Sequence, residues 1–322
     1  MKPFRPNGPC AVVIPCFNEA DRLNVDAFAE FVRDTDGIEL VFVDDGSSDQ
    51  TLQTAQHVSK NAGSSVSILR LAENRGKAEA VRQGMLWAAQ REFSAIAFWD
   101  ADLATPLETI PDFLEVLSKH SSVEVVWGTR LPLMGHTIDR DAIRHQTGRL
   151  FSASSAAAVG VGIRDALCGA KMFRTGPILD AILARPFSSR WIFDVEILAR
   201  LDLLLKSIGG PSVRQSLYEF PLNSWNEIPG SRLRKIDFLR ATVELTDLCW
   251  RYRIFPAKTR AELLNDYVQF GSGVLALSPD CRVVVDTSEA ADTIRRASRP
   301  TLDESDEQTI EFARRRVAWV QH

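Results

Sequence analysis

An alternation of short apolar runs and helical patterns in roughly the first hundred residues constrains this fold most. The apolar runs are rich in β-branched and aromatic residues, which predicts buried strands. We predict these strands over residues 10–15, 39–43, 66–71 and 94–99, with helices over 18–33, 51–61 and 78–91 between them. Strands that alternate with helices form a parallel sheet with right-handed crossovers. The pattern therefore predicts an α/β domain with a mostly parallel, Rossmann-like sheet and helices on both faces.

In the later part of the chain, strands and helices alternate less regularly. We predict a helix that ends near 119, helices over 140–161, 191–205 and 234–252, and strands over 123–127, 169–173 and 218–222. After Pro256 the pattern changes to a hairpin, 274–277 with 282–285, followed by two polar helices, 288–297 and 302–320. We therefore predict one domain over residues 1–256 and a small α+β appendage of unknown role over 257–322.

Composition excludes several classes of function. The 322 residues have a formal net charge of −4, which gives no indication of a nucleic-acid partner. The five cysteines lie far apart with no Cys-x-x-Cys pair, which argues against a zinc site or a disulfide framework and suits a reducing compartment. The N-terminus lacks a signal-peptide pattern, and no apolar run approaches the length of a membrane span. We expect a cytoplasmic protein, or one peripheral to the cytoplasmic face of a membrane.

Charged side chains follow three of the predicted strands directly. Loops after the carboxyl ends of parallel strands lie at one edge of the sheet, where ligands bind. The residues concerned are Asp44, Asp45, Arg75, Lys77, Asp100 and Asp102. Two carboxylates one residue apart, such as Asp100 and Asp102, can hold one hard divalent cation. Alone, an Asp-x-Asp motif is more often a solvated turn, so its position after a buried strand is what makes it informative.

Four motifs in order resemble family 2 glycosyltransferases of the GT-A fold. They are Val-Val-Ile-Pro-Cys-Phe-Asn-Glu at 12–19, Phe-Val-Asp-Asp-Gly-Ser-Ser-Asp-Gln-Thr at 42–51, Asn-Arg-Gly-Lys at 74–77 and Asp-Ala-Asp at 100–102. Further motifs at 162–165, 168–173, 190–196 and 225–231 look like the dolichyl-phosphate β-glucosyltransferase branch. That branch moves glucose from UDP-glucose to a polyprenyl phosphate with inversion. The resemblance covers about residues 11–252.

The resemblance implies a nucleotide-sugar site along the sheet edge. Pro15, Asn18 and Glu19 would border the base and ribose, Asp44 would accept a hydrogen bond from the base, and Asp45 would lie nearby. Arg75 and Lys77 would bind the diphosphate at a helix N-terminus. Asp100 and Asp102, with Ala101 between them, would hold Mg²⁺ or Mn²⁺. A tight turn with a helix cap at Asp49 is the structural alternative for residues 44–49.

The acceptor side is less determined. Arg130, Arg144 and Arg149 are candidates for an acceptor phosphate, because guanidinium groups match phosphate oxygens. A solvated helix face is the alternative for Arg144 and Arg149. Lys171 joins these candidates or lies in a strand facing water. Trp191 and Trp225 are candidates for stacking on a sugar ring, with core packing as the alternative.

Asp194 distinguishes the two functional hypotheses. A phosphate acceptor needs no base, whereas a hydroxyl acceptor does, and Asp194 is then the expected base. The first hypothesis is hexose transfer from a UDP-sugar to a polyprenyl or other phosphate. The second is transfer to a hydroxyl of a soluble glycan or metabolite. A binding protein without catalysis is the third, and the intact Asp-Ala-Asp argues against it. The sequence leaves the oligomeric state open, a dimer included.

Overall fold

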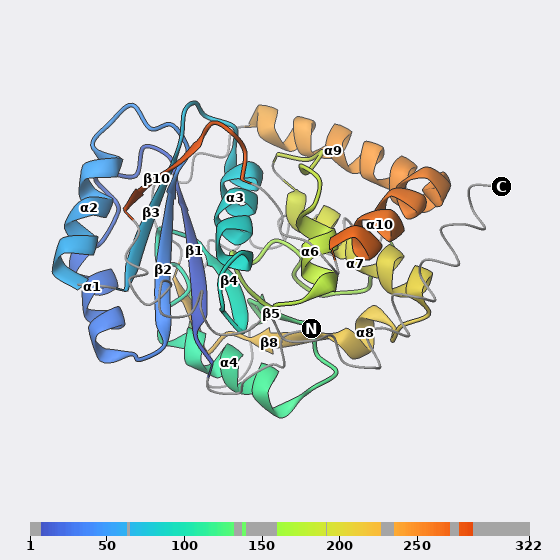
Figure 1. Cartoon of the computed structure of the whole chain (residues 1–322), viewed down its shortest axis with the longest axis horizontal. Helices are drawn as coiled ribbons and strands as arrows, with labels where there is room; N and C mark the ends of the chain where they lie inside the picture. Colours follow the sequence, from blue (N-terminus) through green and yellow to red (C-terminus); the bar gives the residue numbers. More distant parts are fainter. Residues whose placement is uncertain are drawn as a thin grey trace.

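A computed structural model describes residues 8–62, 65–131, 137–139, 160–190, 192–226, 235–270 and 277–285 of the chain (Figure 1). The main sheet has eight strands in the order β10-β3-β2-β1-β4-β7-β5-β8. They are β1 (Cys10–Cys16), β2 (Ile38–Asp44), β3 (Val66–Leu71), β4 (Ala95–Trp99), β5 (Val125–Thr129), β7 (Ala170–Arg174), β8 (Leu217–Pro221) and β10 (Cys281–Val285). A second small sheet pairs β6 (Thr137–Asp139) with β9 (Ser224–Asn226) in parallel.

Helices cover both faces of the main sheet (Figure 1). One hydrophobic cluster joins the sheet to α1 (Val25–Asp34), α2 (Thr51–Ala62) and α4 (Thr109–Lys119). The other joins it to α3 (Lys77–Ala89), α6 (Pro177–Leu183), α7 (Phe193–Ile208) and α10 (Pro256–Phe270). The remaining helices are α8 (Val213–Ser216), α9 (Lys235–Cys249) and the π-helix η1 (Trp250–Ile254). Alternate residues of β1 enter the two clusters, as expected for a strand covered on both sides.

The mostly parallel sheet predicted from the sequence is confirmed. β3, β2, β1 and β4 run parallel, with β1 between β2 and β4. The antiparallel direction of β7, between β4 and β5, was not predicted from the sequence. Because of this reversal, Ala170 at the start of β7 pairs with Trp99 at the end of β4. The chain that enters β7 therefore lies at the edge where the charged loops gather.

The first helix begins later than predicted. The expected start at Asn18 is wrong: α1 begins at Val25, with the Asn24 side chain accepting a hydrogen bond from the Ala27 amide at 3.1 Å. Asn18 has a φ of 52°, which is outside the helical region. Residues 17–24 are instead a loop that lies beside the loop after β2.

The part of the chain after Pro256 packs against the main domain. Leu263, Leu264 and Tyr267 of α10 are buried in the cluster with α6 and α7. The strand predicted over 282–285 is confirmed as β10, which pairs with β3. The other strand of the predicted hairpin, 274–277, lies mostly outside the described residues. The helices predicted over 140–161, 288–297 and 302–320 lie wholly or mostly outside the described residues. Among the described helices, none has the length and apolarity needed to span a bilayer.

Candidate active site

The loops after β1 and β2 are joined by hydrogen bonds. The Asn18 amide donates to Ser47 Oγ at 2.9 Å, and Asn18 Oδ1 accepts from the Ser48 amide at 2.9 Å. The Glu19 amide donates to Thr51 Oγ1 at 2.7 Å. These contacts hold Asn18 and Glu19, which follow Pro15 of β1, against the start of α2. The structure thus brings together three of the residues that the sequence assigned to the base and ribose.

The consecutive aspartates at the end of β2 have different partners. Asp44 Oδ1 accepts from the Ser47 amide at 3.0 Å, and Asp44 Oδ2 lies 3.3 Å from Arg70 Nε. Asp45 accepts from the amides of Arg75 and Gly76, both at 2.8 Å. The pKa of Asp45 is raised, because the effect of burial outweighs these two amide bonds, which lower it. Asp45 therefore ties the loop after β2 to the loop that leads into α3.

The cap predicted at Asp49 is confirmed. Its Oδ1 accepts from the amide of Thr51 at 2.9 Å and from the Thr51 hydroxyl at 2.5 Å. Thr51 is the first residue of α2. Burial raises the pKa of Asp49, but the bonds from Thr51 and Ala20 outweigh it and the pKa is lowered.

The Asp-Ala-Asp motif leaves β4 toward this edge. The Asp100 amide donates to the Gly169 carbonyl at 3.1 Å, and Ala101 is buried. A Cβ on Gly169 would lie 2.0 Å from Asp100 Oδ2, so the Asp100 carboxylate occupies space that only glycine leaves open. Asp102 Oδ1 accepts from the Ala104 amide at 3.1 Å, and Oδ2 lies 3.5 Å from Arg22 Nη2. The motif is a defined turn with both carboxylates at the edge of the site.

Basic side chains neutralise these carboxylates. Lys77 Nζ forms an ion pair with Asp100 Oδ1. Burial lowers the pKa of Lys77, but the charges of Asp100 and Asp194 raise it further than burial lowers it. Burial and the negative charge of Asp100 raise the pKa of Asp102. The two carboxylates therefore repel each other, and cations stabilise their charged forms.

These carboxylates fit a divalent cation that takes few protein ligands. Within the described residues, no group of three or more His, Cys, Asp and Glu side chains could enclose an ion. Asp100 and Asp102 supply hard oxygen ligands, and Mg²⁺ is commonly bound through one or two carboxylates plus phosphates and water. The donor set suits Mg²⁺ or Mn²⁺ shared with a diphosphate better than an enclosed protein site.

Lys171 and Asp194 form a buried ion pair next to the motif. Lys171 Nζ lies 2.8 Å from Asp194 Oδ1, and it also donates to the Cys168 carbonyl. Its ammonium group lies 4.5 Å from the Trp127 ring centroid and 4.9 Å from that of Phe98. The alternative that Lys171 faces water is wrong, because its side chain is fully buried in β7. The pKa of Asp194 is raised, because the effect of burial outweighs the lowering by Lys171 and Lys77.

Arg130 is held by a residue that the sequence reasoning left without a role. Its Nε and Nη2 donate to the two oxygens of Asp165 at 2.6 and 2.7 Å. The guanidinium carbon also lies 5.4 Å from the ring centroid of Trp225. Asp165 raises the pKa of Arg130, against the lowering effect of burial. Asp165 belongs to the motif at 162–165, but its partner lies 35 residues away in the sequence.

The predicted site residues are thus only partly brought together. Lys77, Asp100, Asp102, Lys171 and Asp194 form one charged cluster. Arg75 instead pairs with Asp280 of the C-terminal segment, at 2.6 Å. Arg144, Arg149 and Trp191 lie outside the described residues. Arg22 was missed, although it follows Glu19 by three residues and reaches Asp102.

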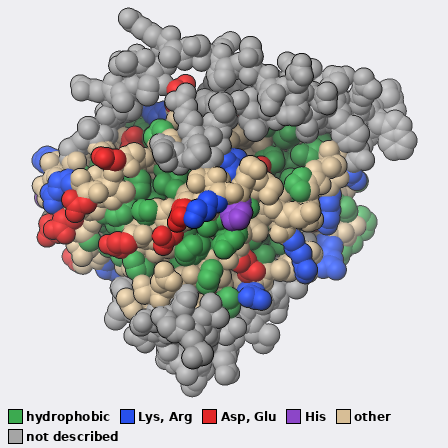
Figure 2. Space-filling model, turned by 90° about the horizontal axis from the view of Figure 1, so that it is seen from below, with side chains coloured by type: hydrophobic (Ala, Val, Ile, Leu, Met, Phe, Trp, Pro, Cys, Tyr) green, Lys and Arg blue, Asp and Glu red, His purple; other side chains and the backbone are tan. Residues whose placement is uncertain are grey.

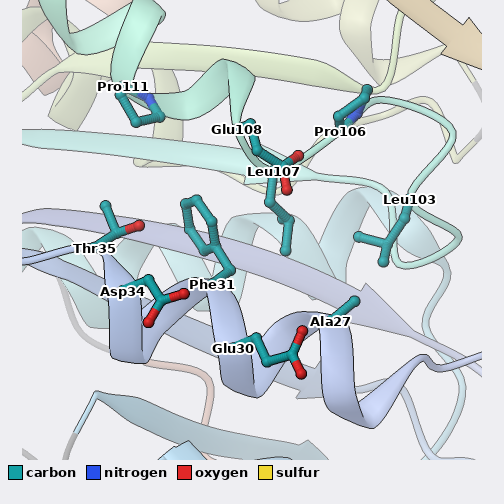
Figure 3. A pocket seen from close by; sticks show the side chains of 10 residues that line it. All are labelled: Ala27, Glu30, Phe31, Asp34, Thr35, Leu103, Pro106, Leu107, Glu108 and Pro111. Carbon is teal, nitrogen blue, oxygen red and sulfur yellow. The ribbon is translucent and has the colours of Figure 1, made fainter.

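A separate groove lies between α1 and the segment that leads into α4 (Figure 3). It is lined by Ala27, Glu30, Phe31, Asp34, Thr35, Leu103, Pro106, Leu107, Glu108 and Pro111. None of the predicted site residues lines it. On the face shown in Figure 2, acidic side chains gather toward one end with basic side chains beside them, and further basic side chains lie toward the other end. The charged cluster, and not this groove, is therefore the candidate active site.

Comparisons with known proteins agree with the fold and the motifs. The family model described as "Glycosyl transferase family 2" matches residues 11–178. A dolichyl-phosphate beta-glucosyltransferase of Drosophila melanogaster is 33% identical over 247 residues, which are 69% of this chain and 68% of that protein. The dolichyl-phosphate beta-glucosyltransferase of Saccharomyces cerevisiae is 29% identical and covers 75% of this chain and 74% of its own length.

A solved structure extends the likeness to the fold. Glucosyl-3-phosphoglycerate synthase from Mycobacterium tuberculosis, in complex with Mn²⁺, UDP-glucose and phosphoglyceric acid, superimposes with a TM-score of 0.54 at 18% identity. The match covers 75% of this chain and 80% of that chain. The predicted GT-A fold is confirmed. With more than half of its residues matched by the family model, the chain belongs to glycosyl transferase family 2.

Proposed function

We propose that this chain transfers a hexose, glucose in the first instance, from a UDP-sugar to a polyprenyl phosphate, with inversion. The observation that carries the proposal is the cluster of alternating charges formed by Asp102, Asp100, Lys77, Asp194 and Lys171. It lies at the carboxyl ends of the strands, where α/β proteins bind ligands. The dolichyl-phosphate beta-glucosyltransferases among the relatives support this sugar and this class of acceptor.

On the donor side, Asp100 and Asp102 would hold Mg²⁺ or Mn²⁺ beside the diphosphate. When bound, the ion supplies positive charge that stabilises the departing nucleoside diphosphate. Lys77 is the first residue of α3, so its ammonium group and the helix N-terminus would both attract the diphosphate. Its raised pKa keeps the Lys77 ammonium charged at neutral pH. Asn18, Glu19 and Asp44 would bind the nucleoside.

On the acceptor side, a phosphate oxygen is ionised at neutral pH and attacks without a base. The bond to the diphosphate breaks as the new bond forms on the opposite face of the anomeric carbon, which gives inversion. Arg144 and Arg149 would bind the acceptor phosphate. We propose that Arg130, fixed by Asp165, contributes to the same side of the site and orients Trp225 toward the sugar.

Transfer to a hydroxyl is the second candidate, and the position of Asp194 favours it. Asp194 pairs with Lys171, and the charges of Lys77 and Asp100 also act on its carboxyl group, so it belongs to the same charged cluster. Its raised pKa also suits a proton acceptor. The ion pair with buried Lys171 argues the other way, because it occupies one carboxylate oxygen.

Nucleotide release distinguishes the candidates. Purified protein with Mn²⁺ would be given UDP- and GDP-sugars, each with and without a short-chain polyprenyl phosphate. We expect UDP release from UDP-glucose that depends on the lipid phosphate. UDP release that does not depend on the lipid phosphate but increases with a hydroxyl acceptor would favour the second candidate. Absence of release under both conditions would contradict both candidates.

A further inference from the structure

An exposed apolar stripe runs along α9 and η1. Val243, Trp250, Ile254 and Phe255 are 66, 56, 56 and 58% exposed, and all four are among the large hydrophobic residues that the described surface exposes. Val243 and Trp250 are two helical turns apart, and Ile254 follows about one turn of the π-helix later, so they share one face. The Phe255 ring lies 4.5 Å from the Trp250 ring, which extends the stripe around the end of the helix.

The opposite face of the same helices is already used for folding. Ala241, Leu248 and Tyr252 are buried. The Tyr252 hydroxyl donates to Glu196 Oε1 at 2.9 Å, within a network that also includes Arg200. The stripe is therefore a second apolar face, and core packing does not account for it. Exposed apolar patches of this kind mark interaction sites.

The charges beside the stripe indicate the kind of partner. From Trp250 to Lys258 the sequence contains three basic residues, namely Arg251, Arg253 and Lys258, and no acidic residue. Arg260 is not counted with them, because its Nε donates to the buried Ser207 Oγ at 3.0 Å. Arg251 pairs with Asp247 at 2.7 Å on the preceding turn. Exposed Trp and Phe next to arginine and lysine are typical of helices that lie in a membrane interface. A second copy on a two-fold axis would bring the same excess of basic residues beside the stripe to both sides of the contact, which disfavours self-association.

The stripe and the candidate active site are connected through neighbouring residues of α9. Glu244 follows Val243 and accepts from the Arg190 amide at 3.3 Å and from Ser189 Oγ at 2.5 Å. Arg190 Nη2 donates to Asn74 Oδ1 at 3.2 Å, and its Nε would lie 2.8 Å from a Cβ on Gly76. Gly76 directly precedes Lys77. Figure 1 shows α9 on the outside of the molecule, at the end away from α1 and α2.

We infer that Val243, Trp250, Ile254 and Phe255, with the neighbouring basic residues, dock the protein on an anionic lipid surface. The docking would present the Lys77 side of the site to an acceptor anchored in that surface. In this sense the inference deepens the proposed function and rests on it. The aromatic side chains would enter the headgroup region, and the arginines and lysine would face anionic headgroups.

Vesicle co-sedimentation of the full-length chain tests the inference without donor or polyprenyl phosphate. The vesicles would be phosphatidylcholine alone, or phosphatidylcholine with a minority of phosphatidylglycerol. We expect binding to the anionic vesicles that weakens with added salt. The double variant Trp250→Glu/Phe255→Glu should bind at least about tenfold more weakly, because it removes both aromatic insertions. Val283→Glu is the matched control, since Val283 is 43% exposed on β10, and its binding should match that of the unchanged chain.

The outcomes separate this inference from the proposed function. No binding of the unchanged chain to anionic vesicles would overturn the docking surface. So would equal losses for the double variant and the Val283→Glu control. A dimer that the double variant dissociates, without vesicle binding, would assign the stripe to a second copy. Vesicle binding without lipid-phosphate-dependent UDP release would leave the docking surface standing and remove the proposed transfer.

Discussion

A substitution at Asp102 tests whether this side chain binds a cation or only shapes its turn. Asn at this position keeps the oxygen that accepts from the Ala104 amide but loses the charge. We expect Asp102→Asn to lower Mn²⁺-dependent turnover at least about 100-fold, the scale for one preorganised electrostatic contact. Thermal unfolding should stay within about 0.5 kcal/mol of the unchanged protein. The exposed Asp21→Asn is the control, and full activity in Asp102→Asn would remove the residue from the site.

Lys171 is expected to matter for stability as well as for the site. Lys171→Met leaves the buried Asp194 carboxylate without its cation, which costs about 3–5 kcal/mol of unfolding free energy. The double variant Lys171→Met/Asp194→Asn should recover part of this loss, because no buried charge remains. Urea unfolding of the two variants measures both effects. Equal losses in the single and double variants would contradict the ion-pair explanation.

The pH dependence of the Lys171→Met variant follows from the same pair. Burial raises the folded-state pKa of Asp194, and Lys171 lowers it. Without Lys171 the folded pKa rises further above the unfolded value of about 3.9. A raised acid pKa stabilises the fold below the unfolded pKa, and this contribution is lost as pH rises through the folded pKa. The deficit of the variant should therefore be largest near neutral pH and shrink toward acid pH.

At the scale of elements, Asp49 fixes the start of α2. Asp49→Ala removes the bonds to the Thr51 amide and hydroxyl, which should cost about 1 kcal/mol. The pKa of Asp49 is lowered in the folded chain, so its contribution is present above the unfolded pKa and is lost as pH falls through the folded value. The difference in melting temperature between the two proteins should thus shrink in acid. If the difference in melting temperature stayed constant with pH, the contribution of Asp49 would come from packing and not from its charged hydrogen bonds.

The elements differ in how well the sequence predicted them. The β-branched runs at β1 to β4 have their own local pattern, so their strands and the edge where their loops meet were predictable. The direction of β7 was not, because it depends on packing between β4 and β5. Gly84 in α3 is similar: a Cβ there would lie 2.4 Å from Val13 Cγ1, so a residue that weakens a helix is required by the sheet beneath it.

The site shows the same division between local and distant contacts. Asp100 and Asp102 were predictable, because adjacent residues and a preceding strand place them together. The partners of Lys171 and Arg130, which are Asp194 and Asp165, lie far away in sequence and meet only in the folded chain. Ion pairs between residues that are distant in sequence produce no periodic pattern in the sequence. For this reason an exposed position was an alternative for Lys171, and Asp165 had no assigned role.

At the scale of the whole molecule, the proposed division at residue 256 has a measurable consequence. Leu263, Leu264 and Tyr267 of α10 are buried against α6 and α7, and β10 covers the edge of β3. A chain that ends at 256 loses both contacts, and each buried side chain contributes about 1.5–3 kcal/mol. We expect this chain to be less stable than the full chain by several kcal/mol in urea unfolding.

The matched control for this truncation is a chain that ends at Val285. It keeps α10, β10 and the ion pair between Asp280 and Arg75, so it should unfold close to the full chain if these described contacts are what the C-terminal part supplies. It should also keep its UDP release, since Asp280 holds the loop that leads to Lys77. Equal stability of the chain ending at 256 and the full chain would instead show that residues 257–322 are an independent appendage.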